Sequence, residues 1–201
     1  MLSPPPAAGI VRLPIVGVMG SAVDAHAERA RQVGRWIAAQ GYHLLTGGGD
    51  GVMGAVTEAF VSVRERAGAS LAVVPCLPGD AAATPLPGYP NRWVEIPIFT
   101  HLDTGRPAGD APSSRNHLNV LSSTVIIFLP GGSGTASEAR LALRYGRPGV
   151  AYLHAREELP ELPAGIPVEA EFERVAEFVR QQAGARVNPR AAGARPPTAR
   201  P

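Results

Sequence analysis

The chain has 201 residues and a formal net charge of +2, and glycine and proline number 23 and 21. All 19 basic residues are arginine, so chemistry that needs a lysine, such as a Walker phosphate-binding loop or a Schiff base, is excluded. The single cysteine, Cys76, excludes an internal disulfide and a cysteine-clustered metal site.

Both ends of the chain are expected to lie outside the folded part. Residues 1–12 form a Pro/Ala-rich flexible arm, and residues 183–201 contain little besides Gly, Pro, Ala and Arg. Neither segment has enough apolar surface to offset the entropy lost on ordering, so the tail is expected to be disordered. Residues 13–182 are then expected to form one domain.

The chain shows no sign of a macromolecular or membrane partner. Without the last 16 residues, 15 arginines face 17 acidic residues, which is not the charge pattern of a nucleic-acid-binding protein. No apolar run has the length of a membrane span, and the amino terminus fits a signal peptide poorly. A cytoplasmic protein that binds a small molecule is expected.

Short apolar runs alternate with segments of helical periodicity along the domain. The first strand is expected at Ile15–Met19, and a helix follows from about Asp24 to Gln40, which Gly41 ends. Further strands are expected at Tyr42–Thr46, Ser70–Leu77, Trp93–Phe99, Thr124–Leu129 and Gly149–Leu153. Further helices are expected at Asp50–Arg66, Ser113–Ser122, Gly134–Tyr145 and Val168–Gln182. This alternation predicts an α/β fold with a Rossmann-like, doubly wound parallel sheet in a single domain.

Two of the expected strand-to-helix turns, residues 46–54 and 130–138, are dense in glycine. Glycine permits positive φ and lets a ligand approach the backbone closely. Successive N–H groups at a helix start also attract anions. Ligands of doubly wound sheets bind beyond the carboxyl ends of the strands, so both turns predict phosphate or nucleotide binding; tight packing of the turns is the alternative.

Several other site types fit the sequence poorly. Gly49–Gly54 matches GxGxxG, but it follows the second strand and no acidic residue ends the next one, so NAD is not expected. Gly131–Thr135 resembles a nucleophile elbow but ends in threonine, without a suitable His/Asp arrangement. The five histidines lack metal-ligand spacing. Neither a metal nor a cofactor is therefore predicted.

Arg115 and Glu138 are the charged residues expected nearest to the second turn. The arginine fork can hold phosphate or position a substrate. A carboxylate can bind ribose hydroxyls, stabilise oxocarbenium-like charge and activate water. Taken singly, a surface arginine and a helix acid near the positive end of the helix dipole are the plainer interpretations. Arg106, in the loop 100–112, is a further candidate for contacting phosphate.

The two turns resemble the motifs GGGxxGxMG and PGGxGTxxE of the "Lonely Guy" superfamily, once misnamed lysine decarboxylases, over residues 13–155. The resemblance implies a Rossmann-like homodimer that hydrolyses nucleoside 5′-monophosphates to a free base, such as adenine or a cytokinin, and ribose 5-phosphate. It assigns Arg115 and Glu138 as catalytic. The implied substrate- and phosphate-binding residues are Gly48, Gly49, Gly51, Met53, Asn116, Gly131, Gly132, Ser133, Gly134 and Thr135.

One departure from this pattern keeps a second function open. The enzymes usually have Arg-Lys where this chain has Arg115-Asn116. The run of residues 114–122 is similar to a sister branch, the molybdenum-cofactor carrier-like proteins. That branch implies a non-catalytic protein that binds or carries a nucleotide or a pterin-type cofactor. Phosphoribohydrolase and carrier are therefore the two predicted functions.

Overall fold

The computed structural model describes residues 12–103 and 109–187, and within them seven strands form one sheet in the order β4-β3-β2-β1-β5-β6-β7. All neighbouring strands are parallel. The strands are β1 (Ile15–Met19), β2 (His43–Thr46), β3 (Ser70–Pro75), β4 (Ile96–Thr100), β5 (Val125–Phe128), β6 (Gly149–Tyr152) and β7 (Val168–Glu169). The helices are α1 (Ala27–Ala39), α2 (Val52–Val61), α3 (Asn116–Ser122), α4 (Ser133–Arg144) and α5 (Phe172–Val187), with a 3₁₀ turn at Arg156–Glu158. The α/β, Rossmann-like prediction is confirmed.

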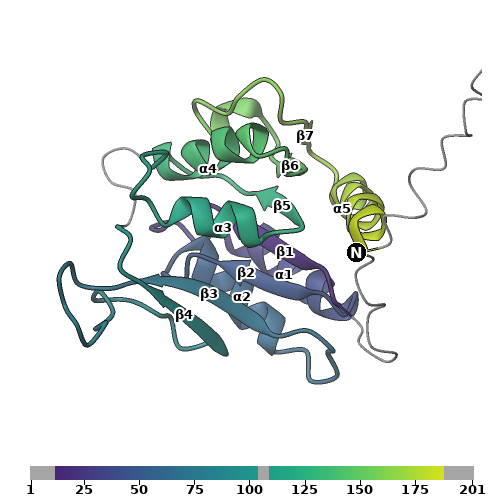
Figure 1. The fold of residues 1–201 in the computed structure, drawn as a ribbon. Coiled ribbons are helices and arrows are strands. Elements are labelled where there is room, and N and C mark those ends of the chain that lie inside the picture. Colours follow the sequence, from purple (N-terminus) through teal and green to yellow (C-terminus); the bar gives the residue numbers. More distant parts are fainter. Residues whose placement is uncertain (1–11, 104–108, 188–201) are drawn as a thin grey trace, which may run out of the picture.

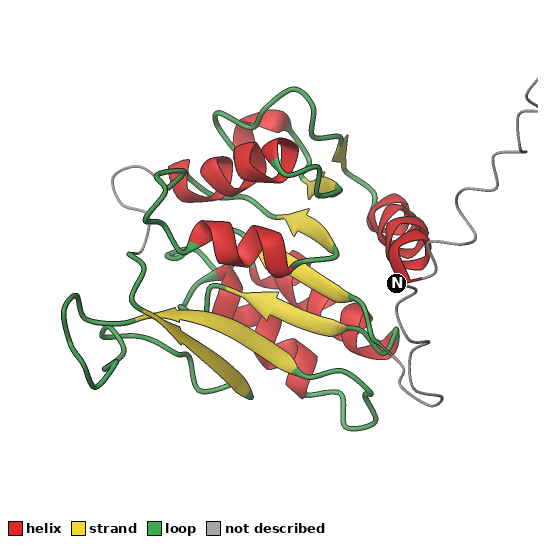
Figure 2. Ribbon diagram, in the orientation of Figure 1, coloured by secondary structure: helices red, strands yellow, loops and turns green. Residues whose placement is uncertain are grey.

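Helices cover both faces of the sheet (Figures 1 and 2). One buried apolar cluster packs the sheet against α1, α2 and α5, and a second packs it against α3 and α4. Within β5, Ile127 belongs to the first cluster, whereas Ile126 and Phe128 belong to the second. Strands buried on both faces have to be apolar at every position, which explains the continuous apolar runs in the sequence.

The expected elements form, but their bounds differ by a few residues, most of all at the carboxyl-terminal helix and at the end of α2. The helix expected over Val168–Gln182 is preceded by β7, because Val168 pairs with Ala151 of β6. That helix, α5, then continues to Val187 and so includes residues 183–187 of the expected tail; Ala183 is buried at 1% exposure. The rest of the expected tail and residues 1–11 of the expected arm lie outside the described residues.

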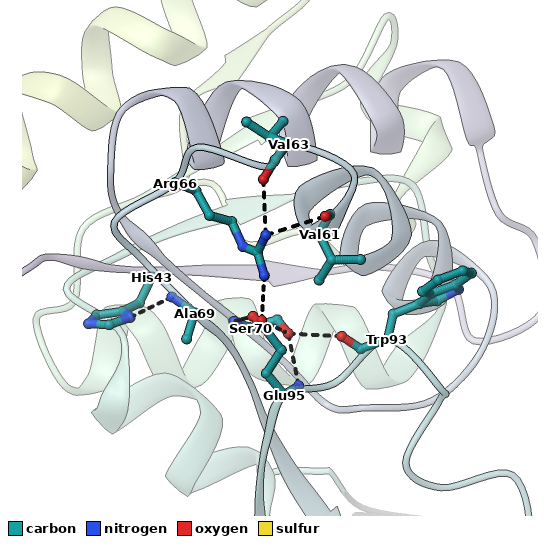
Figure 3. Close-up of polar contacts among 8 residues, drawn as sticks. All are labelled: His43, Val61, Val63, Arg66, Ala69, Ser70, Trp93 and Glu95. Atoms are coloured by element: carbon teal, nitrogen blue, oxygen red, sulfur yellow. Dashed lines mark hydrogen bonds and ion pairs between the residues drawn. The ribbon is translucent and has the colours of Figure 1, made fainter.

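Helix α2 ends at Val61, five residues before the predicted end, and Arg66 fixes the chain that follows (Figure 3). The Arg66 guanidinium donates to the backbone carbonyls of Val61 and Val63, at 3.3 and 2.9 Å. It also pairs with Glu95, whose carboxylate accepts a hydrogen bond from the Ser70 amide at 2.9 Å. These contacts join the end of α2 to the starts of β3 and β4, at the edge of the sheet opposite to the predicted ligand site.

Among the described residues, no helix has the length and apolarity to cross a membrane.

Candidate functional site

A cleft of about 1080 Å³ lies at the carboxyl edge of the sheet. It opens where β1 has β2 on one side and β5 on the other, which is the switch point at which doubly wound sheets bind ligands. The segments after β1, β2 and β5 contribute to it, together with α3 and the loop between β3 and β4. Its lining residues include Gly20–Val23, Gly47, Met53, Leu86, Tyr89, Arg115, Asn116, Asn119, Gly132–Thr135 and Glu138.

The amino end of α4 is open to this cleft. The first hydrogen bond of the helix runs from the Ala136 amide to the Gly132 carbonyl at 3.0 Å. The amides of Ser133, Gly134 and Thr135 therefore precede the helical ladder and extend beyond the amino end. Residues 132–134 are exposed, and a Cβ atom built at Gly132 or Gly134 would meet nothing within 4 Å. The positive end of the helix dipole thus has room for an anion.

Backbone hydrogen bonds of Pro130 and Gly131 fix the position of this helix start. Its amide donates to the Glu158 carbonyl at 3.2 Å, and the adjacent Pro130 carbonyl accepts from the Ser21 amide at 2.9 Å. A Cβ at Gly131 would lie 2.3 Å from Thr135 Oγ1, so any other residue here would displace the Thr135 side chain. Glu158 is itself held by Arg29 through two hydrogen bonds of 2.6 and 2.8 Å, and this ion pair lowers the pKa of Glu158 to about 2.

The first glycine turn has a different role from the second. Gly47 and Met53 line the cleft, as Met53 was expected to do. Gly48, Gly49 and Gly51, which lie between them in the sequence, are not among the lining residues and contact neighbouring loops instead. Asn91 donates to the Gly48 carbonyl through its backbone amide at 2.7 Å and to the Gly49 carbonyl through its side chain at 2.9 Å. Gly51 has a φ of 61°, and a Cβ there would lie 2.4 Å from the Ser21 carbonyl oxygen.

Arg115 is buried at 5% exposure, which excludes the interpretation as a surface arginine. It precedes the first residue of α3 and its Nη1 donates to the carbonyls of Gly47, at 2.5 Å, and of Val73. The guanidinium carbon lies 5.1 Å from the centre of the Tyr89 ring. Burial lowers the pKa of Arg115, and Tyr89 and Glu138 oppose that effect. Among the described residues, Arg115 Nε has no hydrogen-bond partner.

Glu138 lies in the middle of α4, in the same cleft as Arg115. It is 8% exposed, and its Oε1 accepts a hydrogen bond of 2.9 Å from Asn119 Nδ2. Burial raises the pKa of Glu138 from 4.5 to about 7, although the Asn119 hydrogen bond and the Arg115 charge act in the other direction. A buried carboxyl that titrates near neutrality is a common feature of functional sites.

Several lining residues were not predicted from the sequence, among them Asn119 and Tyr89. Asn119 lies one helical turn after Arg115, and that spacing is the signal that could have identified it. Tyr89 belongs to a Pro/Gly-rich loop that carries no pattern pointing to the cleft. The predicted Asn116 also lines the cleft, and its side chain donates to Ser137 Oγ at 3.1 Å.

Two further residues were considered in the sequence. Arg106 lies outside the described residues. Cys76 is buried, as expected of a small core residue. Within residues 12–103 and 109–187, no group of three or more His, Cys, Asp or Glu residues could hold a metal ion.

Comparisons with known proteins agree with this architecture. The sequence model of the SLOG cluster4 family matches residues 13–175. Among solved structures, the molybdenum cofactor carrier protein of Chlamydomonas reinhardtii is 30% identical, with a TM-score of 0.64 over 86% of this chain and 99% of that chain. The molybdenum cofactor binding protein of Rippkaea orientalis is also 30% identical, with a TM-score of 0.65 over 86% and 98%. DNA processing protein A of Helicobacter pylori, at 18% identity and a TM-score of 0.60 over 85% and 81%, shares the fold alone. No curated protein matches the sequence significantly.

Proposed function

This chain belongs to the SLOG cluster4 family, and from that premise we propose that it binds and carries a phosphate-bearing pterin-type ligand, the molybdenum cofactor. The observation that carries the proposal is that the open amino end of α4 faces the same cleft as the polar side chains of Arg115, Asn119 and Glu138. The two relatives at 30% identity are described as carrying or binding this cofactor, and the match spans 98–99% of their chains. The cofactor combines a pterin ring with a terminal phosphate, so it has one group for the polar side chains and one for the start of α4.

The phosphate end of the ligand fits the start of α4. The amides of Ser133, Gly134 and Thr135 supply three donors, and the helix dipole adds a partial positive charge. Backbone donors are sufficient here, which agrees with a chain that contains no lysine. The absence of a Cβ at Gly132 and Gly134 leaves space for phosphate oxygens to approach the backbone.

The ring of the ligand has an apolar part of the lining to pack against. Met53 and Tyr89 both line the cleft, and both lie within 3.2 Å of the position that a Cβ of Gly49 would occupy. They therefore form a continuous wall of a polarisable thioether and an aromatic ring. Such a wall packs well against a flat heterocycle.

A second candidate function is the hydrolysis of nucleoside 5′-monophosphates by the same cleft. Glu138 favours it, because a buried carboxyl with a pKa of about 7 is partly ionised at neutral pH and can accept a proton from water. Its charge would also stabilise an oxocarbenium-like ribose, while Arg115 would position the substrate. The products would be a free base and ribose 5-phosphate. The expected homodimer and cytoplasmic location remain predictions.

Gly134→Asp tests the anion site directly. The substituted position has open space around it, and an acid in the first turn suits the helix dipole, so the fold should tolerate the change. A carboxylate about 5 Å from a bound phosphate repels it by a few kcal/mol at an effective dielectric constant of about 20, so affinity should fall at least tenfold. Gly184→Asp adds the same charge at an exposed position of α5, also with open space, and should leave affinity unchanged.

The measurement is retention of molybdenum cofactor, released from a molybdoenzyme, through gel filtration with the protein, followed by pterin fluorescence and molybdenum content. No retention by wild-type protein would contradict the carrier function, and equal retention by Gly134→Asp and wild-type protein would contradict the placement of the phosphate at the start of α4. The second candidate is tested by incubating the protein with AMP and cytokinin monophosphates. Release of a free base that Glu138→Gln abolishes would favour the hydrolase instead.

A further inference from the structure

Arg115, Asn119 and Glu138 form a row of polar side chains along one wall of the cleft. Arg115 and Asn119 are one turn apart, and the backbone amide of Asn119 donates to the backbone carbonyl of Arg115 at 3.2 Å. Asn119 Nδ2 donates to Glu138 Oε1 at 2.9 Å, from α3 to α4. Asn119 is therefore the middle member of the row, and all three residues line the cleft.

Two atoms of this row lack the partner that a buried polar atom normally has. Asn119 Oδ1 and Arg115 Nε are buried, and neither has a hydrogen-bond partner within the part of the chain that the structure describes. The other ends of both side chains are occupied, Asn119 Nδ2 by Glu138 and Arg115 Nη1 by the carbonyls of Gly47 and Val73. Because buried polar atoms are nearly always hydrogen-bonded, one acceptor and one donor at the cleft wall point to a ligand that supplies their partners.

The order of these groups defines the ligand edge that fits. Arg115 Nε is a donor, Asn119 Oδ1 is an acceptor and the Glu138 carboxylate is an acceptor. The complement is a planar edge with an acceptor, a donor and a second donor in the same order. A 2-amino-4-oxopyrimidine ring presents this edge through its carbonyl, its ring N–H and its exocyclic amino group.

We propose that this row recognises the 2-amino-4-oxopyrimidine edge shared by pterins and guanine, with Asn119 as the central specificity-determining residue. The inference rests on the proposed function and specifies its ligand. Arg115 donates to the ring carbonyl, Asn119 accepts from the ring N–H, and Glu138 accepts from the exocyclic amino group. Adenine presents an amino donor and a ring acceptor at the same edge. Its amino group would face the Arg115 Nε donor, and its ring nitrogen would face the Asn119 Oδ1 acceptor, so neither hydrogen bond would form.

The position of the row agrees with a ligand whose phosphate lies at the start of α4. Glu138 follows Gly134 by four residues on the same helix, which is a rise of about 6 Å. The anion site and the ring-edge site are thus about one helical turn apart along the wall of one cleft. A single nucleotide or pterin phosphate can therefore occupy both.

A ligand series on the wild-type protein tests the proposal without any substitution. GMP, IMP and AMP share the ribose 5′-phosphate and differ at the ring edge, and titration calorimetry gives their affinities. We expect IMP, which lacks the amino group, to bind about tenfold more weakly than GMP, because the hydrogen bond from the amino group to Glu138 is lost. AMP should bind more weakly still. A pterin phosphate and its lumazine counterpart, which has an oxo group in place of the amino group, test the pterin edge in the same way.

Asn119→Leu should lower the affinity for GMP about tenfold and should lower the ratio of GMP to AMP affinities by the same factor. Binding of ribose 5-phosphate should be unchanged, which shows that the cleft remains folded. Asn119→Asp retains an acceptor oxygen and should keep more of the GMP preference than Asn119→Leu. Equal wild-type affinities for GMP and AMP, or an affinity ratio that Asn119→Leu does not change, would overturn this inference alone if ribose 5-phosphate still binds. Failure of wild-type protein to bind any of these phosphates would overturn the proposed function as well.

Discussion

The buried carboxyl group of Glu138 should make the protein less stable as the pH rises toward neutrality. Its pKa is raised from 4.5 to about 7 because burial disfavours the charged form. Below pH 4.5 the folded and the unfolded chain are both protonated at this group. Between pH 4.5 and 7 the unfolded chain loses the proton while the folded chain keeps it, so stability falls over this window and levels off above it.

The size of the effect follows from the two pKa values. A tenfold change in proton affinity corresponds to about 1.4 kcal/mol, so the change from 4.5 to about 7 is worth about 3 kcal/mol. Glu138→Gln keeps the shape of the side chain and an oxygen that can accept from Asn119 Nδ2, but it carries no charge to desolvate. The variant should therefore be more stable than wild-type protein by about 3 kcal/mol at pH 8.5, and the difference should shrink toward pH 4.5.

Urea unfolding at a series of pH values from 4.5 to 8.5 measures this directly. The difference between the variant and wild-type protein removes the contributions of all other titrating groups. Glu65→Gln, at an exposed position outside the cleft, is the control for the loss of one carboxyl group. A Glu138→Gln difference that is flat across the pH range would refute the reasoning, because it would mean that Glu138 titrates alike in the folded and unfolded chain.

Two further predictions concern residues that hold the site in place. Glu158→Gln should lower the free energy of unfolding by about 2 kcal/mol at pH 7, because it breaks the ion pair with Arg29. This loss should disappear as the pH falls toward the folded pKa of about 2. Urea unfolding that gives a constant loss down to pH 3 would be contrary evidence. Gly51→Ala should cost about 2 kcal/mol or more, because φ is 61° and the new Cβ would meet the Ser21 carbonyl. Gly54→Ala, where the nearest atom is 3.8 Å away inside α2, should be neutral or stabilising by up to about 1 kcal/mol, and equal thermal unfolding of the two alanine variants would contradict the assignment.

The sequence alone was enough to predict the architecture and the open start of α4. Apolar runs such as Val125–Phe128, flanked by helical periodicity, require a sheet that is covered on both faces, and the structure has one. Gly132 and Gly134 between a strand and a helix predict an open helix start, and α4 begins there. Both features depend on residues close together in the chain, because periodicity and turn chemistry are local properties.

Only the tertiary structure decided which residues meet in the cleft. Arg115 contacts Gly47, 68 residues away, and Asn119 contacts Glu138, 19 residues away. The motif assigns Gly48, Gly49 and Gly51 to the ligand, but in the structure they contact Asn91 and Ser21, which belong to other loops. These contacts depend on how α3, α4 and the β3–β4 loop pack over the end of the sheet. Local patterns carry no information about such packing, and burial there is also what raises the pKa of Glu138.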